Sequence, residues 1–208
     1  MSQTVDDMTY GEIGEQTMEN MERALDHVKR TFNLEVLPDG EAGQAIRHLT
    51  ELAFTDPLTG AFNRRFLDIY LDDLVKRDAD FTVVMFDHDD FKQLNDRFGH
   101  DRGDDLLIYS AAHAAKFFRG KGVVARQSGA ADEFVVVLES ADAAEAATWA
   151  DAFRNHVAAC DEPRHSTTIS VGVVQRRKGE DRASIMKRAD AAMYKAKHLG
   201  GNTTRAEV

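Results

Sequence analysis

A short apolar run that ends in a burst of acidic residues constrains the fold of this chain more than any other feature. The run extends from Phe81 to Phe86 and is rich in β-branched and aromatic residues, which predicts a buried strand. The segment Asp87-His-Asp-Asp90 follows directly. Because charge at the end of a buried strand is costly unless it is solvated, paired or bound to a metal, the fold must bring Asp87 one of these partners.

Periodicity and turn signals place this strand in an alternating order of helices and strands. Helices are predicted over 64–76, 104–118, 143–159 and 183–198, and strands over 81–86, 123–125, 133–138 and 167–174. The second and third strands lie close enough in sequence to form a hairpin. The order α, β, α, β-hairpin, α, β, α is typical of an α/β (α+β) sandwich, in which helices flank a mainly antiparallel central sheet.

A helical extension precedes this unit. Amphipathic spacing predicts one helix over 17–32 and a second over 41–54. We therefore divide the chain into an N-terminal helical segment, 1–51, and a second domain, 52–208. Two interpretations of the segment stay open at this point: its helices pack on the domain or on each other, or they serve dimerisation or signal input.

Net charge and cysteine content limit the kinds of binding partner and the compartment that the chain suits. The formal net charge of −10 argues against broad binding to nucleic acid or to an anionic membrane, but a few placed cations and Mg²⁺ still suffice to hold a nucleotide. Cys160 is the single cysteine, which agrees with a reducing compartment. No apolar run approaches the roughly 18–20 residues that span a bilayer, and the N-terminus is polar and acidic. The expectation is a cytoplasmic protein without nucleic-acid or membrane binding.

A second pair of acids opens the second hairpin strand. Asp132 and Glu133 precede another apolar run, Phe134 to Leu138. Acids from two adjacent strand ends are able to converge on a metal pair, and carboxylate oxygens are the ligands that Mg²⁺ prefers. By spacing alone, a solvated acidic loop remains the alternative to a metal site.

Five motifs occur in the sequence in the order that is typical of one known family. The sequence resembles the GGDEF family of diguanylate cyclases from about Leu52 to Asn202. The motifs are Asp56-Pro-Leu-Thr-Gly60 with Asn63-Arg64-Arg65; Asp87-His-Asp-Asp-Phe-Lys92 with Asn95-Asp96, Gly99-His100 and Gly103-Asp104; Asp132-Glu133-Phe134; Ser170-Val-Gly172; and Ala189-Asp190, Met193-Tyr194 and Ala196-Lys197.

The resemblance implies a palm-like fold, akin to nucleotidyl cyclases and polymerases, that joins two GTP molecules into cyclic di-GMP across a homodimer. It implies Mg²⁺ (or Mn²⁺) as the cofactor. The roles implied are metal ligation by Asp87, the backbone carbonyl of His88 and Asp132; hydroxyl activation by Asp132 and Glu133; guanine recognition by Asn95 and Asp104; and phosphate contacts from Lys92, Lys197 and the backbone near Phe91.

The sequence departs from the family pattern around the phosphates. Ala130 and Ala131 stand where the family has the two glycines of its hairpin, and two extra residues follow Arg126. An alanine adds a methyl group where the nucleotide would contact these two positions, and it costs about 1 kcal/mol or more in a left-handed conformation. Gly201 stands where the family has a phosphate-binding arginine.

These departures leave several functions open. The favoured interpretation is a degenerate domain with weak or no turnover that binds GTP or regulates, with a possible protein partner at the N-terminal helices. The alternative is an active diguanylate cyclase that tolerates the altered hairpin. Two further hypotheses stay open: the domain catalyses another nucleotidyl reaction, or its motifs now serve only folding.

Overall fold

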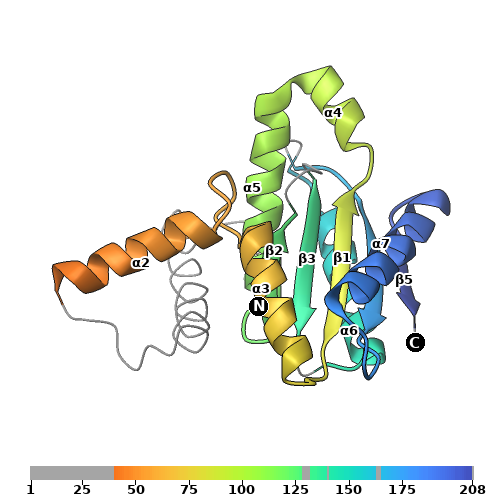
Figure 1. Cartoon of the computed structure of the whole chain (residues 1–208). Coiled ribbons are helices and arrows are strands. Elements are labelled where there is room, and N and C mark those ends of the chain that lie inside the picture. Colours follow the sequence, from red (N-terminus) through yellow and green to blue (C-terminus); the bar gives the residue numbers. More distant parts are fainter. Residues whose placement is uncertain (1–39, 128–131, 140, 163–164, 208) are drawn as a thin grey trace, which may run out of the picture.

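The sheet at the centre of the molecule confirms the predicted fold class. In the computed structural model, residues 40–127, 132–139, 141–162 and 165–207 are described, so the helix predicted over 17–32 lies outside them. Among these residues five strands pair in the order β2-β3-β1-β4-β5 (Figure 1). Their bounds are β1 Thr82–His88, β2 Gly122–Arg126, β3 Glu133–Leu138, β4 Ile169–Gln175 and β5 Thr204–Glu207. All pairs are antiparallel except β4 with β5, which is parallel.

Helices cover both faces of this sheet. The helices are α2 Glu41–Phe54, α3 Arg64–Lys76, α4 Phe91–Phe98, α5 His100–Phe117, α6 Ala143–Ala158 and α7 Arg182–His198. One core packs α5 and α6 on the face that carries Val84 and Phe86, and the other packs α3 and α7 on the face that carries Val83 and Met85 (Figure 1). Because successive strand residues point to opposite faces, β1 is buried along its whole length, as its apolar composition predicts.

The structure corrects three details of the prediction. Strand β1 continues through Asp87 to His88, so Asp87 lies inside the sheet rather than just beyond it. The segment 91–98, to which the sequence analysis assigned no element, forms helix α4, which is only eight residues long and buries only Phe91. Strand β5 is short and mostly polar, so the sequence contains no apolar run that predicts it. Its backbone pairing with β4 identifies it as a strand.

The Asp56 motif is structural in this molecule. The Asp56 carboxylate accepts hydrogen bonds from the Thr59 amide and hydroxyl at 3.0 and 2.7 Å, and Arg126 pairs with it at 2.9 Å. Burial alone would raise the pKa of Asp56, but the hydrogen bonds from Thr59 and Arg126 hold that pKa below its ordinary value. The motif therefore joins the start of the domain to Arg126, the last residue of β2. Only Gln127 separates Arg126 from the altered hairpin.

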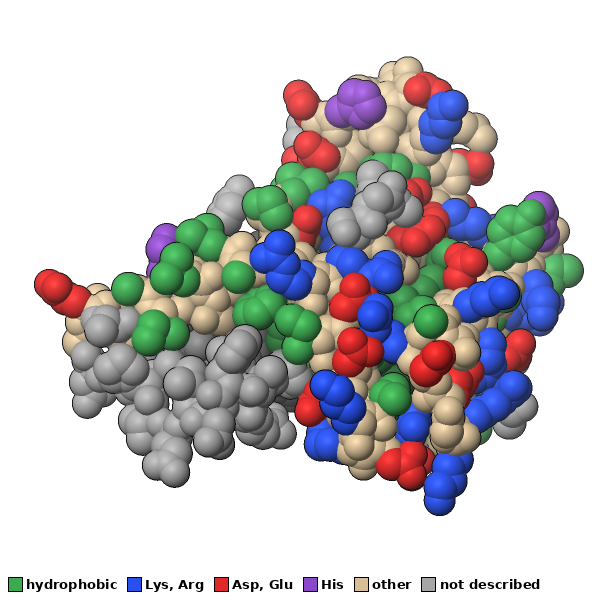
Figure 2. Space-filling model, in the orientation of Figure 1, with side chains coloured by type: hydrophobic (Ala, Val, Ile, Leu, Met, Phe, Trp, Pro, Cys, Tyr) green, Lys and Arg blue, Asp and Glu red, His purple; other side chains and the backbone are tan. Residues whose placement is uncertain are grey.

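Helix α2 extends away from the sheet (Figure 1). It confirms the helix predicted over 41–54, and its apolar residues Leu49 and Leu52 have relative exposures of 63% and 65%. Hydrophobic side chains gather on α2 in Figure 2, whereas acidic and basic side chains are interspersed over the rest of that face. The predicted boundary after residue 51 falls within α2 and stays a prediction. Within the described ranges, the helices are too short or too polar to cross a membrane.

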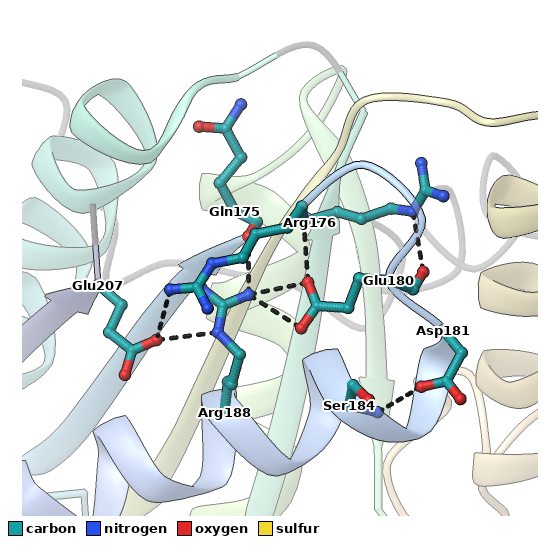
Figure 3. A network of polar contacts seen from close by, with 8 residues as sticks. Gln175, Arg176, Glu180, Asp181, Ser184, Arg188 and Glu207 are labelled. Carbon is teal, nitrogen blue, oxygen red and sulfur yellow. Dashed lines mark hydrogen bonds and ion pairs between the residues drawn. The ribbon is translucent and has the colours of Figure 1, made fainter.

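An arginine network fastens α7 to the strands beside it (Figure 3). Arg188 on α7 binds both carboxylate oxygens of Glu180 at 2.9 and 3.1 Å, Glu207 of β5 at 2.9 Å and the Gln175 carbonyl of β4 at 3.1 Å. The side chains of Arg188 and Glu180 are only 17% and 9% exposed. Water therefore has little access to replace the hydrogen bonds of either side chain if its partner is removed. The network therefore ties one helix to two strands.

We expect Arg188→Met to lower the free energy of unfolding by about 2–3 kcal/mol, because it leaves Glu180 partly buried without its cation. Chemical denaturation monitored by circular dichroism measures this loss. Arg177→Met is the matched control: its side chain is 65% exposed and lies 3.7 Å from Glu207, so we expect a change below about 0.5 kcal/mol. Equal effects of the two substitutions would contradict the role given to Arg188.

Candidate active site

The predicted acids meet at the end of β1. Asp87 lies opposite Glu133 of β3 on one side and Ser170 of β4 on the other. Helix α4 starts just beyond β1, and the last turn of α7 supplies Lys197. Residues from the two strand ends that the sequence singled out are therefore neighbours.

Asp87 has a cation on one oxygen and no partner on the other. Its Oδ2 lies 2.7 Å from Lys197 Nζ, whereas its Oδ1 is buried and accepts no hydrogen bond. The Asp132 carboxyl lies within hydrogen-bonding reach of Asp87. Burial raises the pKa of Asp87 to about 7, the negative charge of Asp132 adds to this, and Lys197 opposes it. The site holds more negative charge than its own residues neutralise.

Glu133 completes the acidic group. Burial raises its pKa, and the charges of Asp190 and Asp132 act in the same direction, while Lys197 and Arg64 oppose them. Asp190, on α7, is a site neighbour to which the sequence analysis gave no role, although it belongs to the Ala189-Asp190 motif. Only the packing of α7 on the sheet brings it near β3.

His88 is expected to serve the site through its backbone carbonyl, and its ring is buried. The imidazole is 1% exposed, packs near the rings of Phe91 and Phe134, and has no hydrogen-bond partner on either nitrogen. Burial lowers the pKa of His88 to about 4, so the ring is neutral at physiological pH. Phe91 is the first residue of α4, where backbone N–H groups lack intrahelical acceptors and suit a phosphate.

The two residues expected to contact guanine lie on adjoining helices. Asn95 is on α4, and its Oδ1 is buried without a hydrogen-bond partner. Gly103 of α5 packs directly on it: a Cβ at Gly103 would lie 2.1 Å from that oxygen. Asp104, the next residue, is exposed on α5, and Lys92 is exposed on the first turn of α4. The structure thus brings α4 and α5 together at Asn95 and Gly103, while the guanine contacts of Asn95 and Asp104 stay a prediction.

The residues fit a divalent cation. A buried, unpaired carboxylate oxygen next to a second carboxylate is what a hard cation such as Mg²⁺ binds, and Oδ1 of Asp87 is such an oxygen, whereas Lys197 pairs with Oδ2. In the described part of the chain, no group of three or more His, Cys, Asp or Glu residues is arranged around a common metal position. The implied ligand set is smaller, with two carboxylates and the His88 carbonyl.

The altered hairpin itself lies outside the described residues, and so do Ala130 and Ala131. Its two stems are described. The Gln127 amide donates to the Glu133 carbonyl at 2.9 Å, which closes the β2–β3 ladder next to the site. The hairpin therefore starts and ends beside Glu133, while the effect of the two alanines stays a prediction.

Comparison with known proteins shows which family has this fold and these acidic residues. The family described as "Diguanylate cyclase, GGDEF domain" matches residues 53–203, and the chain belongs to it. The response regulator PleD of Caulobacter vibrioides is 37% identical over 166 residues, which cover 74% of this chain and 36% of PleD. The chain therefore spans about a third of that relative.

Solved structures agree with this assignment. The coiled coil and GGDEF domain of DgcB from Caulobacter crescentus, in complex with c-di-GMP, superposes with a TM-score of 0.71 at 27% identity, over 89% of this chain and 98% of that one. The diguanylate cyclase SiaD from Pseudomonas aeruginosa, in complex with its activator SiaC, gives 0.69 at 30% identity, over 91% and 76%. Both coverages exceed the share of the chain that the family domain occupies.

Proposed function

We propose that this chain is a GTP-binding module of cyclic di-GMP signalling, with weak or no turnover. One observation carries the proposal: Asp87 Oδ1 and Asn95 Oδ1 are both buried and both lack a hydrogen-bond partner, at the two places where a metal and a guanine are expected. A buried polar atom without a partner costs about 1–3 kcal/mol, and a bound metal–nucleotide complex removes both costs at once.

In this proposal the residues divide metal binding, guanine recognition and phosphate binding among them. Asp87, Asp132 and the His88 carbonyl hold Mg²⁺ or Mn²⁺, which neutralises phosphate charge when bound. Asn95 and Asp104 pair with the guanine edge, since an amide and a carboxylate match its acceptor and donors. Lys92 and Lys197 contact the terminal phosphates.

Proton transfer falls to the hairpin acids. With its pKa raised by burial, Glu133 accepts a proton more readily than an exposed glutamate does, and it adjoins Asp132. This retained acid group favours the second candidate, an active cyclase that condenses two GTP into cyclic di-GMP. The alanines at 130 and 131 and the glycine at 201 favour weak turnover, because they alter the expected phosphate contacts.

The N-terminal segment, 1–51, is proposed to mediate homodimerisation or to receive a regulatory protein. Leu49 and Leu52 of α2 are exposed large apolar side chains on a helix that extends from the domain. Two structural neighbours that cover 89% and 91% of this chain are a protein with a coiled coil and a protein in complex with its activator. Either role would use the apolar side of α2.

A two-part measurement tests the proposal. We expect titration calorimetry to detect GTP binding in the presence of Mg²⁺, and chromatography of the incubated mixture to detect little or no cyclic di-GMP. Ala130→Gly/Ala131→Gly is expected to raise product formation at least about 10-fold if the alanines limit turnover. Robust turnover by the unmodified chain would establish the alternative, and absence of GTP binding would exclude both.

A further inference from the structure

A cation from the chain itself lies at the candidate metal site. Lys197, in the last turn of α7, places its Nζ 2.7 Å from Asp87 Oδ2. The Asp87 side chain is only 6% exposed, so water and salt screen this ion pair poorly. Lys197 therefore supplies part of the positive charge that a divalent cation would bring to the same carboxylate.

A free divalent cation would compete with this ammonium group for Asp87. The buried, unpaired oxygen Oδ1 belongs to the same carboxylate as the Oδ2 that Lys197 contacts. A cation on Oδ1 would therefore lie close to the Lys197 Nζ, and like charges repel strongly at short range where water is scarce. Binding of a free ion costs either this repulsion or the loss of the Asp87–Lys197 ion pair.

A metal–nucleotide complex avoids this cost, because it brings anions together with the cation. Lys197 is then able to leave Asp87 to the metal and to pass to the terminal phosphates. Its ammonium group sits on a flexible stem of four carbons, and the Lys197 side chain is 36% exposed, so it has room to turn. Both Asp87 and Lys197 exchange one partner of opposite charge for another.

We propose that Lys197 is a specificity-determining residue: it holds Asp87 against free divalent cations and releases it to a metal ion that arrives with phosphates. The inference rests on the proposed function, in which Lys197 contacts the terminal phosphates. Lys197 then has two tasks in sequence, the first at Asp87 and the second at the nucleotide. The site selects a metal–nucleotide complex over the metal alone.

Titration with Mn²⁺ alone tests this role, with the free ion measured by electron paramagnetic resonance under nitrogen. We expect Lys197→Met to raise the affinity for Mn²⁺ at least about 10-fold, because it removes the repelling charge. Lys92→Met is the matched control, since Lys92 is also expected to contact the phosphates but is exposed on α4 and is not the cation beside Asp87. Its substitution should change the Mn²⁺ affinity less than about 3-fold. Both substitutions should weaken GTP binding at saturating Mn²⁺.

Two further conditions keep the comparison of Mn²⁺ affinities sound. Burial raises the pKa of Asp87 and Lys197 opposes this, so without Lys197 a proton competes more strongly with Mn²⁺ for the carboxylate. Each titration is therefore repeated at rising pH until the affinity becomes constant. Lys197→Gln, which removes the charge but keeps an N–H donor for Asp87, is measured beside Lys197→Met and should also gain Mn²⁺ affinity.

Opposite effects on the two affinities are the expected signature, because a merely structural role of Lys197 would lower both together. An Mn²⁺ affinity of the Lys197 variants that equals or falls below that of the unmodified chain would overturn the proposal, and so would an equal gain in Lys92→Met. No nucleotide enters the Mn²⁺ titrations. A failure of the unmodified chain to bind GTP would therefore defeat the proposed function, while the Mn²⁺ affinities would still decide whether Lys197 holds Asp87 against free cations.

Discussion

Asp87→Asn is expected to weaken Mg²⁺-dependent GTP binding by roughly 100-fold or more. The substitution keeps the shape of the side chain and removes the charge that a hard cation needs, and losing a charged contact costs about 1.5–3 kcal/mol before metal affinity is counted. Calorimetric titration of GTP into each protein at saturating Mg²⁺ measures the change. We do not expect the neighbouring Asp132 to compensate, because one carboxylate cannot provide the ligand oxygens of two.

The same substitution is expected to change the pH dependence of stability in the absence of ligand. The pKa of Asp87 is about 7 in the folded protein against an ordinary value of 3.8, so the unfolded chain releases this proton first as pH rises. Stability from the protonated carboxyl is therefore complete below about pH 4 and is lost as pH rises towards 7. Asp87→Asn, which stays neutral, should remove this loss, so its Tm should fall less between pH 5 and pH 8.

Asp80→Asn is the control for both measurements, since it removes the same charge from an exposed residue just before the start of β1, at the other end of the strand from Asp87. It should leave GTP affinity and the pH profile unchanged. Unaltered Mg²⁺-dependent GTP binding in Asp87→Asn would contradict the metal site. A pH profile identical to that of the unmodified chain would contradict the raised pKa.

The second large effect is expected from Gly172→Ala, which should lower the free energy of unfolding by about 3 kcal/mol or more, or Tm by roughly 6–12 °C. Gly172 lies in β4 under α7. A Cβ there would lie 2.5 Å from the Ala189 carbonyl oxygen and 2.5 Å from the Met193 amide nitrogen, both of which are backbone atoms of α7. Backbone cannot move aside as a side chain can, so the whole helix must shift from the sheet.

Differential scanning calorimetry of Gly172→Ala beside Gly179→Ala checks this expectation. Gly179 has a left-handed φ of +78° and open space around it, so its substitution costs about 1 kcal/mol of backbone strain without any collision. A Tm for Gly172→Ala at or above that of Gly179→Ala would show that α7 tolerates the extra methyl group. Because α7 carries Lys197 and Asp190, the predicted shift should also weaken GTP binding.

Much of the site was predictable because its residues follow directly from strand ends. The apolar run ending before Asp87 and the run beginning after Glu133 each predict a strand, and antiparallel pairing of those strands sets Asp87 opposite Glu133. The predicted end of β1 was wrong by two residues. The reason is that pairing with β3 and β4 continues past the last apolar side chain, where the composition gives no signal.

What the sequence determined by itself was the fold class, the family and the identity of the acids, because these depend on local periodicity and on short ordered motifs. Tertiary structure alone decided which groups act on those acids. Lys197 reaches Asp87, Asp190 reaches Glu133 and Asp89 reaches Asn202, each across a long stretch of intervening chain. Such pairings arise from the packing of α7 on β4 at Gly172, where contact distance and not residue pattern fixes the neighbours.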